Sequence, residues 1–200
     1  MKFLRFDIKN HDIKKVSELI FETEPKVFSL LFGNNKNKAL KRIKSVVKTG
    51  GNSFGYEYIY LAIEKNKILG LTIFYNGLDI DKKIESDNFS KALGFFGIFR
   101  LMLYDQILLR RLLTNSLDER DMYISNICVD QNIRGKGIGR FLLDNVILQA
   151  NKDHCKKIIL DVSKDNGIAI NLYKNTGFKI INKKTSKFWK ITVCKMIKKL

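Results

Sequence analysis

The sequence predicts an α+β fold, in which several helices accompany a sheet. Short runs rich in Ile, Val and aromatic residues alternate with segments whose apolar residues recur at helical spacing. Two of these runs, residues 58–64 and 68–74, are separated by only three polar residues and indicate a β-hairpin. A later run near residue 124 leads through a glycine-rich turn into an amphipathic helix.

Length and composition indicate one globular domain. The 200 residues are 45% hydrophobic, and no internal repeat or Pro/Gly/Ser-rich linker divides them, so we expect residues 1–200 to form a single domain. The first residues lack the charged-then-apolar pattern of a leader, which predicts a cytoplasmic protein. Three cysteines without ligand spacing and only two histidines suit a reducing compartment and predict that no metal is bound.

The chain carries a formal net charge of +17, with 16 basic and 6 acidic side chains in residues 121–200. Such a charge favours a polyanionic ligand, and a polyphosphate cofactor bound by the second part would be attracted to it. A solvated surface is the simpler explanation for the lysines of residues 179–199, which alternate with apolar residues. No nucleic-acid recognition motif accompanies the charge, so we do not expect a nucleic-acid partner.

The remaining elements follow from periodicity and from helix-ending residues. Pro25 is favoured in the first turn of a helix, and Gly33 and the pair Gly50-Gly51 mark helix ends. Gly70 lies inside a predicted strand, where glycine often marks a bulge. The predicted strands are 3–6, 58–64, 68–74, 124–129, 158–162, 179–183 and 188–196, and the predicted helices are 12–22, 25–33, 37–47, one from about 141, and 166–175.

The glycine-rich turn has the composition of an anion-binding loop. Gly135, Gly137 and Gly139 alternate with other residues directly before a helix, where backbone N–H groups and the helix dipole favour a phosphate. A P-loop is excluded because Lys136 is followed by Gly137, and the even spacing does not fit a dinucleotide fingerprint. A turn that merely joins a strand to a helix remains the alternative. The flanking basic residues are Arg134, Lys136 and Arg140.

Two motifs together resemble those of the GCN5-related N-acetyltransferase (GNAT) family. The pattern Arg134-x-x-Gly137-x-Gly139 resembles motif A, and Asn166-x-x-Ala169-x-x-Leu172-Tyr173-x-x-x-Gly177-Phe178 resembles motif B in every signature position. The resemblance covers about residues 122–180. Many members have Pro where this chain has Gln131, and the loss of a residue that fixes φ puts the rigidity of the loop in doubt.

The resemblance implies an α/β/α sandwich with a mixed, mostly antiparallel twisted sheet flanked by helices. It also implies an acetyl-CoA-dependent transfer of an acetyl group to a primary amine. The acceptor would be a small molecule or a peptide or protein, and the net charge favours a neutral or acidic one unless a local acidic groove reverses this. For Asn166 a helix N-cap is the alternative role. The implied cofactor-binding residues are the backbones of Ile127, Cys128 and Val129 for pantetheine, then Arg134, Gly135, Lys136, Gly137, Ile138, Gly139 and Arg140 for the pyrophosphate, and Asn166.

Two catalytic residues are implied by the same resemblance. Tyr173 would protonate the departing thiolate, and a tyrosine packed in the core is the alternative. Asp161 lies five residues before Asn166, where some N-terminal acetyltransferases of the family have the Glu that serves as base; a solvated or ion-paired Asp is the alternative. Many members have a Glu at the position of Ser125. Other candidate bases are Glu57 and Glu64.

A non-catalytic protein that binds coenzyme A, or RNA through its lysines, is the competing functional class, although the presence of Tyr173 favours an enzyme. The apolar segment 89–113 lies in a helical insertion at about 83–117. Arg100 and Asp105 interrupt it, so we expect no membrane span but one or two helices, the second at about 104–113, with Gly94 and Gly97 weakening the first. These helices would cover the sheet, line an acceptor pocket or form a dimer contact.

Overall fold

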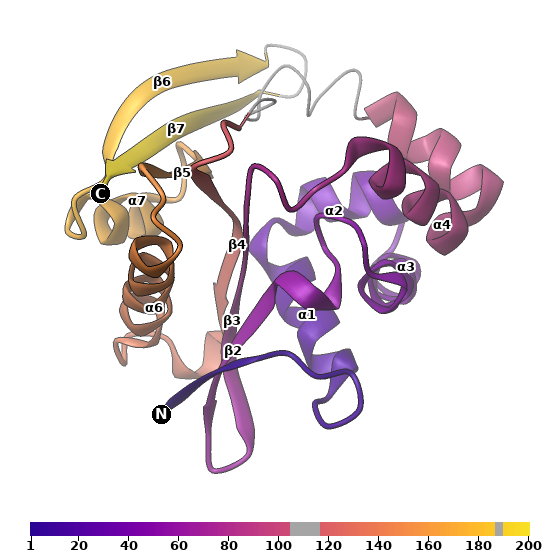
Figure 1. The fold of residues 1–200 in the computed structure, drawn as a ribbon. Coiled ribbons are helices and arrows are strands. Elements are labelled where there is room, and N and C mark those ends of the chain that lie inside the picture. Colours follow the sequence, from indigo (N-terminus) through magenta and orange to yellow (C-terminus); the bar gives the residue numbers. More distant parts are fainter. Residues whose placement is uncertain (105–116, 187–189) are drawn as a thin grey trace.

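A computed structural model describes residues 1–104, 117–186 and 190–200, and their strands form one seven-stranded sheet (Figure 1). The strand order is β1-β2-β3-β4-β5-β7-β6. Every neighbouring pair is antiparallel except β4 and β5, which confirms the predicted mixed, mostly antiparallel sheet. The strands are β1 Lys2–Arg5, β2 Ile59–Glu64, β3 Lys67–Asn76, β4 Asp121–Val129, β5 Lys157–Ser163, β6 Lys179–Ser186 and β7 Ile191–Lys199.

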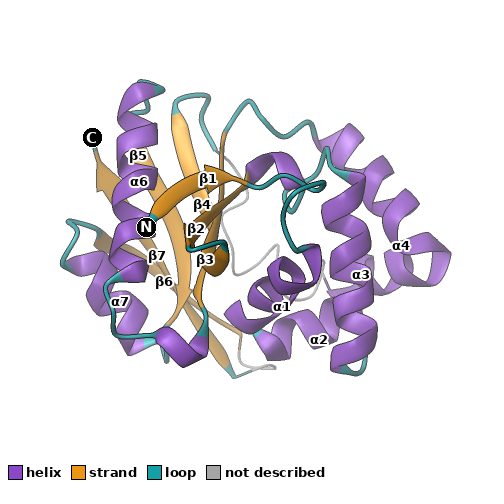
Figure 2. Cartoon of the chain, turned by 90° about the horizontal axis from the view of Figure 1, so that it is seen from below, coloured by secondary structure: helices purple, strands orange, loops and turns teal. Residues whose placement is uncertain are grey.

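Helices cover both faces of this sheet, as the sandwich fold requires (Figure 2). The first four lie on one face and the last two on the other (Figure 1). Two short 3₁₀ turns, Tyr56–Tyr58 and Gln131–Ile133, precede β2 and follow β4. The helices are α1 Ile13–Thr23, α2 Pro25–Phe32, α3 Lys36–Thr49, α4 Lys82–Tyr104, α6 Ile138–Lys152 and α7 Gly167–Lys174.

The hydrophobic core consists mainly of two clusters, one under each helical layer. Val16, Leu19 and Ile20 of α1 are fully buried with residues of β2 and β3, which explains their three- and four-residue spacing. Leu143 and Val146 of α6 pack in the same way on the opposite face, with residues of β4 and β5. The two helical layers therefore hold the centre of the sheet from both sides.

The junction between α1 and α2 contains a single non-helical residue, Glu24. The Asp12 side chain accepts a hydrogen bond from the backbone N–H of Lys14 and caps α1, so the helix begins one residue later than predicted. Glu24 has φ −151° and ψ 74°, because the residue before a proline is excluded from the helical region. Pro25 then occupies the first turn of α2, as predicted.

The β2–β3 hairpin contains the predicted bulge beside Gly70. Ala62 pairs with Gly70 whereas Ile63 pairs with Ile68, so β3 has one extra residue, Leu69. A Cβ atom on Gly70 would lie 2.5 Å from the carbonyl oxygen of Cys128, and glycine is therefore needed for β3 to approach β4.

Helix α4 contains residues 89–104 of the apolar segment. Its helical backbone geometry is broken at Gly94, whose φ of 65° bends the helix. Phe89 and Leu93 before the bend are buried, whereas the side chains after it include exposed apolar groups, namely Phe95, Phe96, Phe99 and Met102. The predicted helix at 104–113 lies almost entirely outside the described residues. Within the described part, no helix combines the length and hydrophobicity needed to cross a membrane.

Candidate active site

Strands β4 and β5 pair in parallel over only four residues and then separate. Asp121–Ile124 pairs with residues 157–160 of β5, and β5 continues beyond Leu160 only against β7. In the described structure, the edge of residues 125–129 that faces β5 therefore has no partner strand. Unpaired backbone groups at such an edge can hydrogen-bond an extended ligand, and Ile127, Cys128 and Val129 lie on it.

A bulge in β4 lies where the two strands part. Ile73 of β3 pairs with Asn126, but Phe74 pairs with Ile124, so Ser125 is an extra residue in β4. The bulge directs Asn126 toward α1, where its Nδ2 donates to Thr23 Oγ1 at 2.9 Å. Ser125 Oγ donates to Asn126 Oδ1 at 2.8 Å. A serine at this position offers no carboxylate that could act as a base.

The glycine-rich turn after β4 has the backbone geometry that the sequence predicted. Gly135 and Gly137 have φ of 80° and 77°, values that side-chain-bearing residues rarely adopt. A Cβ atom on either glycine would meet no protein atom within 4 Å, so the turn faces open space. Gly139 differs, because a Cβ atom there would lie 3.3 Å from Leu172 of α7. Its small size brings α6 and α7 together.

The start of α6 adds the features of an anion site. Gly137 is the N-cap residue and makes no side-chain cap, so the first backbone N–H groups of this 15-residue helix point at the turn. Ile138 buries its side chain and offers only its backbone. Lys136 is exposed, and Arg140 forms a two-pronged ion pair with Asp144 at 2.8 and 2.9 Å. A ligand would draw Arg140 away from a weak surface pair.

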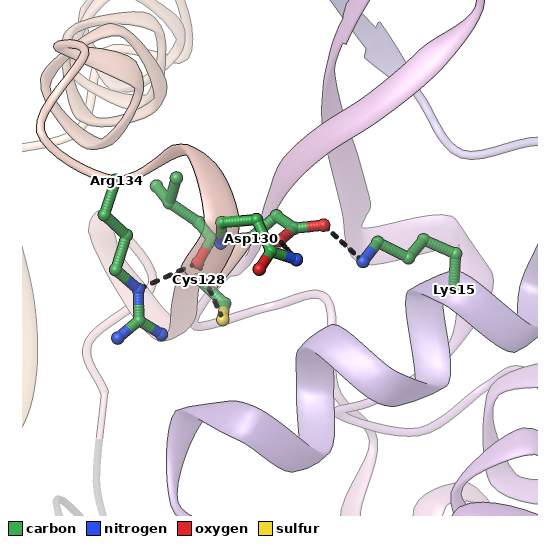
Figure 3. A network of polar contacts seen from close by, with 6 residues as sticks. Lys15, Cys128, Asp130 and Arg134 are labelled. Atoms are coloured by element: carbon green, nitrogen blue, oxygen red, sulfur yellow. Dashed lines mark hydrogen bonds and ion pairs between the residues drawn. The ribbon is translucent and has the colours of Figure 1, made fainter.

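The turn is stiffened without the proline that many family members have at Gln131. Asp130 Oδ1 accepts a hydrogen bond from the backbone N–H of Asn132, and its other oxygen pairs with Lys15 of α1 (Figure 3). The Lys15 hydrogen bond lowers the pKa of Asp130. Arg134 Nε donates to the carbonyl oxygen of Val129 at 3.2 Å (Figure 3). These contacts fix the loop at both ends.

Cys128 lies in the strand edge but is unsuited to nucleophilic catalysis. Burial raises the pKa of its thiol to about 11, so it remains protonated at neutral pH. Its Sγ lies 3.8 Å from the carbonyl oxygen of Val129 (Figure 3). Only the backbone of Cys128 is therefore a candidate for ligand binding.

Asn166 is the N-cap of helix α7, and Tyr173 is the seventh residue of that helix. Asn166 Oδ1 accepts from the backbone N–H of Ala169 at 3.1 Å, and its Nδ2 makes no bond to the described residues. Tyr173 is buried, and its ring centre lies 5.8 Å from that of Phe178. Burial raises the pKa of Tyr173 to about 12. No described residue hydrogen-bonds its hydroxyl group. A tyrosine that serves only to pack the core usually has a hydrogen-bond partner for this group.

Asp161 is the first residue of β5 beyond its pairing with β4. Its neighbours Leu160 and Val162 pack in the same cluster as Tyr173, so Asp161 points to the opposite face of the sheet, as predicted. Tyr123 of β4 donates a hydrogen bond from its hydroxyl to Asp161 Oδ2 at 3.1 Å. Tyr123 is a candidate site residue that sequence reasoning missed, because its partner lies 38 residues away.

The two other carboxylates considered as bases lie away from the opening. Glu57 precedes β2, and its carboxylate accepts from the backbone N–H of Gly51. It lines a cavity of about 160 Å³ that also includes Gln149 and Asp153 at the far end of α6. Glu64 ends β2 and pairs with the amino group of Met1 at 3.5 Å. Strand β3 separates both residues from β4.

The site is thus a strand edge open to a ligand, an anion-binding turn at one end, and titratable side chains on both faces. The chain matches the profile of the Acetyltransferase (GNAT) family over residues 52–178, and it belongs to that family. The separated parallel strands and the turn lie within the matched part.

Curated relatives are similar over about a third of the chain or less. The chain is 36% identical over 56 residues to N-alpha-acetyltransferase 30 of Saccharomyces cerevisiae, covering 28% of this chain and 32% of the relative. It is 39% identical over 66 residues to N-alpha-acetyltransferase 60 of Danio rerio, covering 32% and 27%. The matches thus span about a third of these relatives or less.

Solved structures share the whole fold. A crystal structure of an acetyltransferase superposes with a TM-score of 0.71 at 20% identity, covering 100% of this chain and 99% of that one. An N-acetyltransferase from Staphylococcus aureus Mu50 gives a TM-score of 0.69 at 20% identity, with coverage of 98% and 100%. A GNAT family acetyltransferase from Elizabethkingia anophelis with acetyl-CoA bound gives 0.60 at 17% identity, with coverage of 100% and 97%.

Proposed function

We propose that this protein transfers an acetyl group from acetyl-CoA to a primary amine of a small molecule or of a peptide or protein. The observation that carries the proposal is the opening between β4 and β5, which leads directly to the open glycine turn. The family membership and the relatives with N-acetyltransferase names support it. We also propose that residues 1–200 act as one N-acetyltransferase domain, with residues 83–117 as an insertion.

The residues present fit coenzyme A along the opening. Backbone groups of β4 would hydrogen-bond the pantetheine amides in the manner of an added strand. The turn and the start of α6 would bind the pyrophosphate through backbone N–H groups. When bound, the cofactor supplies an activated acetyl thioester. The proposed contacts are Ile127, Cys128, Val129, Arg134, Gly135, Lys136, Gly137, Ile138, Gly139, Arg140 and the Nδ2 of Asn166.

The acceptor must lose a proton before it can react. A lysine-like ammonium group has a pKa of about 10, so at neutral pH the nitrogen lone pair is mostly blocked. Asp161 can accept this proton, directly or through one water, because the hydrogen bond from the Tyr123 hydroxyl holds its carboxylate beside the point where the two strands part. The freed nitrogen would then bond to the acetyl carbon as the carbon–sulfur bond breaks, and its second proton would leave to solvent as the neutral amide forms.

Tyr173 lies on the other face of the sheet and could donate a proton to the sulfur of the leaving group. Its pKa of about 12 keeps the phenol protonated throughout the usual assay range, so the donor is always present. The phenol is also a weaker acid than a thiol, whose pKa is about 8.5. Tyr173 would therefore stabilise the developing thiolate by a hydrogen bond, and once its proton had passed to sulfur the phenolate would regain one from solvent.

A screen of peptides, polyamines and aminoglycosides with acetyl-CoA, followed through release of free thiol, tests the proposal. We expect at least one amine to accelerate thiol release and to gain roughly 42 Da per acetyl group, the mass of a ketene unit added at nitrogen, with catalytic turnover of the kind enzymes show. If acetyl-CoA binds but no amine is modified, the non-catalytic alternative is correct.

We expect Asp161→Asn to lower kcat/KM about 10²-fold at neutral pH, the lower end of the range for a general base, because the base is lost while the shape is kept. The deficit should shrink as the pH rises, since more of the amine is then already deprotonated. The measurement is kcat/KM against pH for the best acceptor. A loss that is parallel at every pH would assign the base to another group.

We expect Tyr123→Phe to reproduce part of this loss by removing the hydrogen bond that positions Asp161. If the two residues act as a unit, the double variant should be no slower than Asp161→Asn alone, and a double-mutant cycle measures this coupling. Additive losses would show that Tyr123 acts independently of Asp161.

A further inference from the structure

The half of α4 that follows Gly94 exposes a row of apolar side chains, which we call the apolar face. Phe95, Phe96, Phe99 and Met102 recur at three- and four-residue spacing, so they share one side of the helix. Their exposed fractions are 78, 81, 57 and 59%. The ring centres of Phe95 and Phe96 lie 5.6 Å apart, with the rings edge to face. Such a contiguous exposed patch is typical of a docking surface.

The opposite side of this half-helix is fixed to the protein. Gly97 is buried, and a Cβ atom there would lie 3.6 Å from Nε of Arg42 in α3. Arg100 Nε donates to the carbonyl oxygen of Leu30 in α2 at 2.6 Å. Just before the bend, Ser45 of α3 donates to a carbonyl oxygen of α4 at 2.8 Å. These contacts hold α4 in one orientation, so the apolar face points away from the body of the molecule.

The helices beside the apolar face carry only positive charge. Residues 25–49, which include α2 and α3, contain seven basic and no acidic side chains, and residues 88–104 of α4 contain two basic and no acidic ones. Lys41, Lys44 and Lys48 are exposed and recur at three- and four-residue spacing along α3. Helices α3 and α4 lie together at the side of the molecule away from the sheet (Figure 2). An apolar face next to uncompensated positive charge fits a partner that is both apolar and anionic.

We propose that the apolar face and the lysines of α3 bind the surface of an anionic lipid membrane. This half of α4 would lie in the plane of the interface, with its phenylalanines among the upper acyl chains and the lysines against the headgroups. The contact is peripheral and differs from the membrane span that the sequence argues against. It does not depend on the proposed acetyl transfer.

A second copy of this chain fits the apolar face less well than a membrane does. Pairing two apolar faces would bring together two sets of helices that carry no acidic side chain, within chains of net charge +17. Like charges on both partners would oppose such an association. An anionic lipid surface instead satisfies both the apolar and the basic parts of this side of the molecule.

Sedimentation with lipid vesicles tests the apolar face. We expect the wild-type chain to bind vesicles of equimolar phosphatidylcholine and phosphatidylserine, and to bind pure phosphatidylcholine much more weakly. Phe95→Ser combined with Phe96→Ser should weaken binding to the anionic vesicles about tenfold or more, because two rings are lost from the interface. Leu148→Ser combined with Ile181→Ser removes two apolar side chains that are 58 and 54% exposed on α6 and β6, and should bind as wild type.

The same assay tests the lysines of α3. Lys41→Gln combined with Lys44→Gln should weaken binding to the anionic vesicles about tenfold at low salt, and less at high salt where the charges are screened. Lys152→Gln combined with Lys174→Gln removes two exposed charges on α6 and α7 and should have little effect. Circular dichroism melting checks that each variant is folded.

Several results would overturn the proposal. One is a wild type that does not bind the anionic vesicles, and another is undiminished binding by the double phenylalanine variant. Equal weakening by both pairs of lysine substitutions would show adsorption by net charge alone. A dimer in the absence of lipid that dissociates in the double phenylalanine variant would assign the apolar face to a second copy. Competition between vesicles and a single-stranded RNA oligonucleotide, with RNA the tighter ligand, would assign it to a nucleic acid.

Discussion

Tyr173→Phe should lower kcat by about 10² to 10⁴, the range found for loss of a general acid, while acetyl-CoA affinity stays within a few-fold. The hydroxyl is the only group removed, and the ring that packs 5.8 Å from Phe178 is retained. Because burial keeps the pKa of Tyr173 at about 12, the loss should be similar across the neutral and mildly alkaline range. Steady-state kinetics with the best acceptor and calorimetry with acetyl-CoA measure the two quantities.

Stability distinguishes this role from simple packing. Removing a tyrosine hydroxyl that satisfies a buried partner costs about 1 kcal/mol, but the Tyr173 hydroxyl has no partner among the described residues. The Phe variant should therefore melt at nearly the wild-type temperature. Tyr60→Phe is a matched control, since that ring stacks between Phe3 and Phe74 in the part of the sheet formed by β1, β2 and β3. An active Phe variant that unfolds earlier would make Tyr173 a core residue.

Local sequence signals predicted most elements, and their errors have local causes. The hairpin was expected at 58–64 and 68–74, yet Lys67 pairs with Glu64 across a turn of only two residues. Both turn residues, Lys65 and Asn66, adopt positive φ, the geometry of the tight hairpin turn that usually contains glycine. Lysine carries no signal for that geometry, so the second strand was predicted to begin one residue too late.

The apolar segment shows how one glycine can divide a helix between two roles. Gly94 was expected only to weaken the helix, but its positive φ redirects the chain. Leu93 before the bend packs in the core, while Phe96 after it is 81% exposed. Helix α4 packs against α2 and α3 rather than directly on the sheet, and the half after Gly94 presents an apolar surface. Helical periodicity assumes a straight axis and does not reveal such a bend.

The parts of the candidate site that are contiguous in sequence were predicted. The parts that the fold brings together from distant positions were missed. The glycine turn and the Asn166 cap follow from neighbouring residues, and both were confirmed in their local geometry. Tyr123 lies one residue before the predicted strand of residues 124–129, so sequence reasoning assigned it no role. Its contact with Asp161 depends on the parallel pairing of β4 with β5, which no local pattern encodes.

Gly137→Val should weaken acetyl-CoA binding about 10- to 100-fold, or about 1.4 to 2.7 kcal/mol. A Cβ atom at this position meets no protein atom within 4 Å, so its branches would project into the open space where the pyrophosphate is proposed to lie. The substitution also strains the backbone at φ 77°, which would displace the first N–H groups of α6. Calorimetric titration with acetyl-CoA measures the loss.

A second glycine with a positive φ distinguishes backbone strain from a steric block of the ligand. Gly94 has φ 65° and ψ 178°, a region that is almost restricted to glycine, and a Cβ atom there also meets nothing within 4 Å, but it lies in α4, away from the turn. Gly94→Val should therefore lower the melting temperature at least as much as Gly137→Val, without changing acetyl-CoA affinity. Equal weakening by both variants would attribute the effect to general destabilisation. Unchanged affinity in Gly137→Val would place the pyrophosphate elsewhere, because no ligand that contacts these N–H groups closely could tolerate a valine side chain between them.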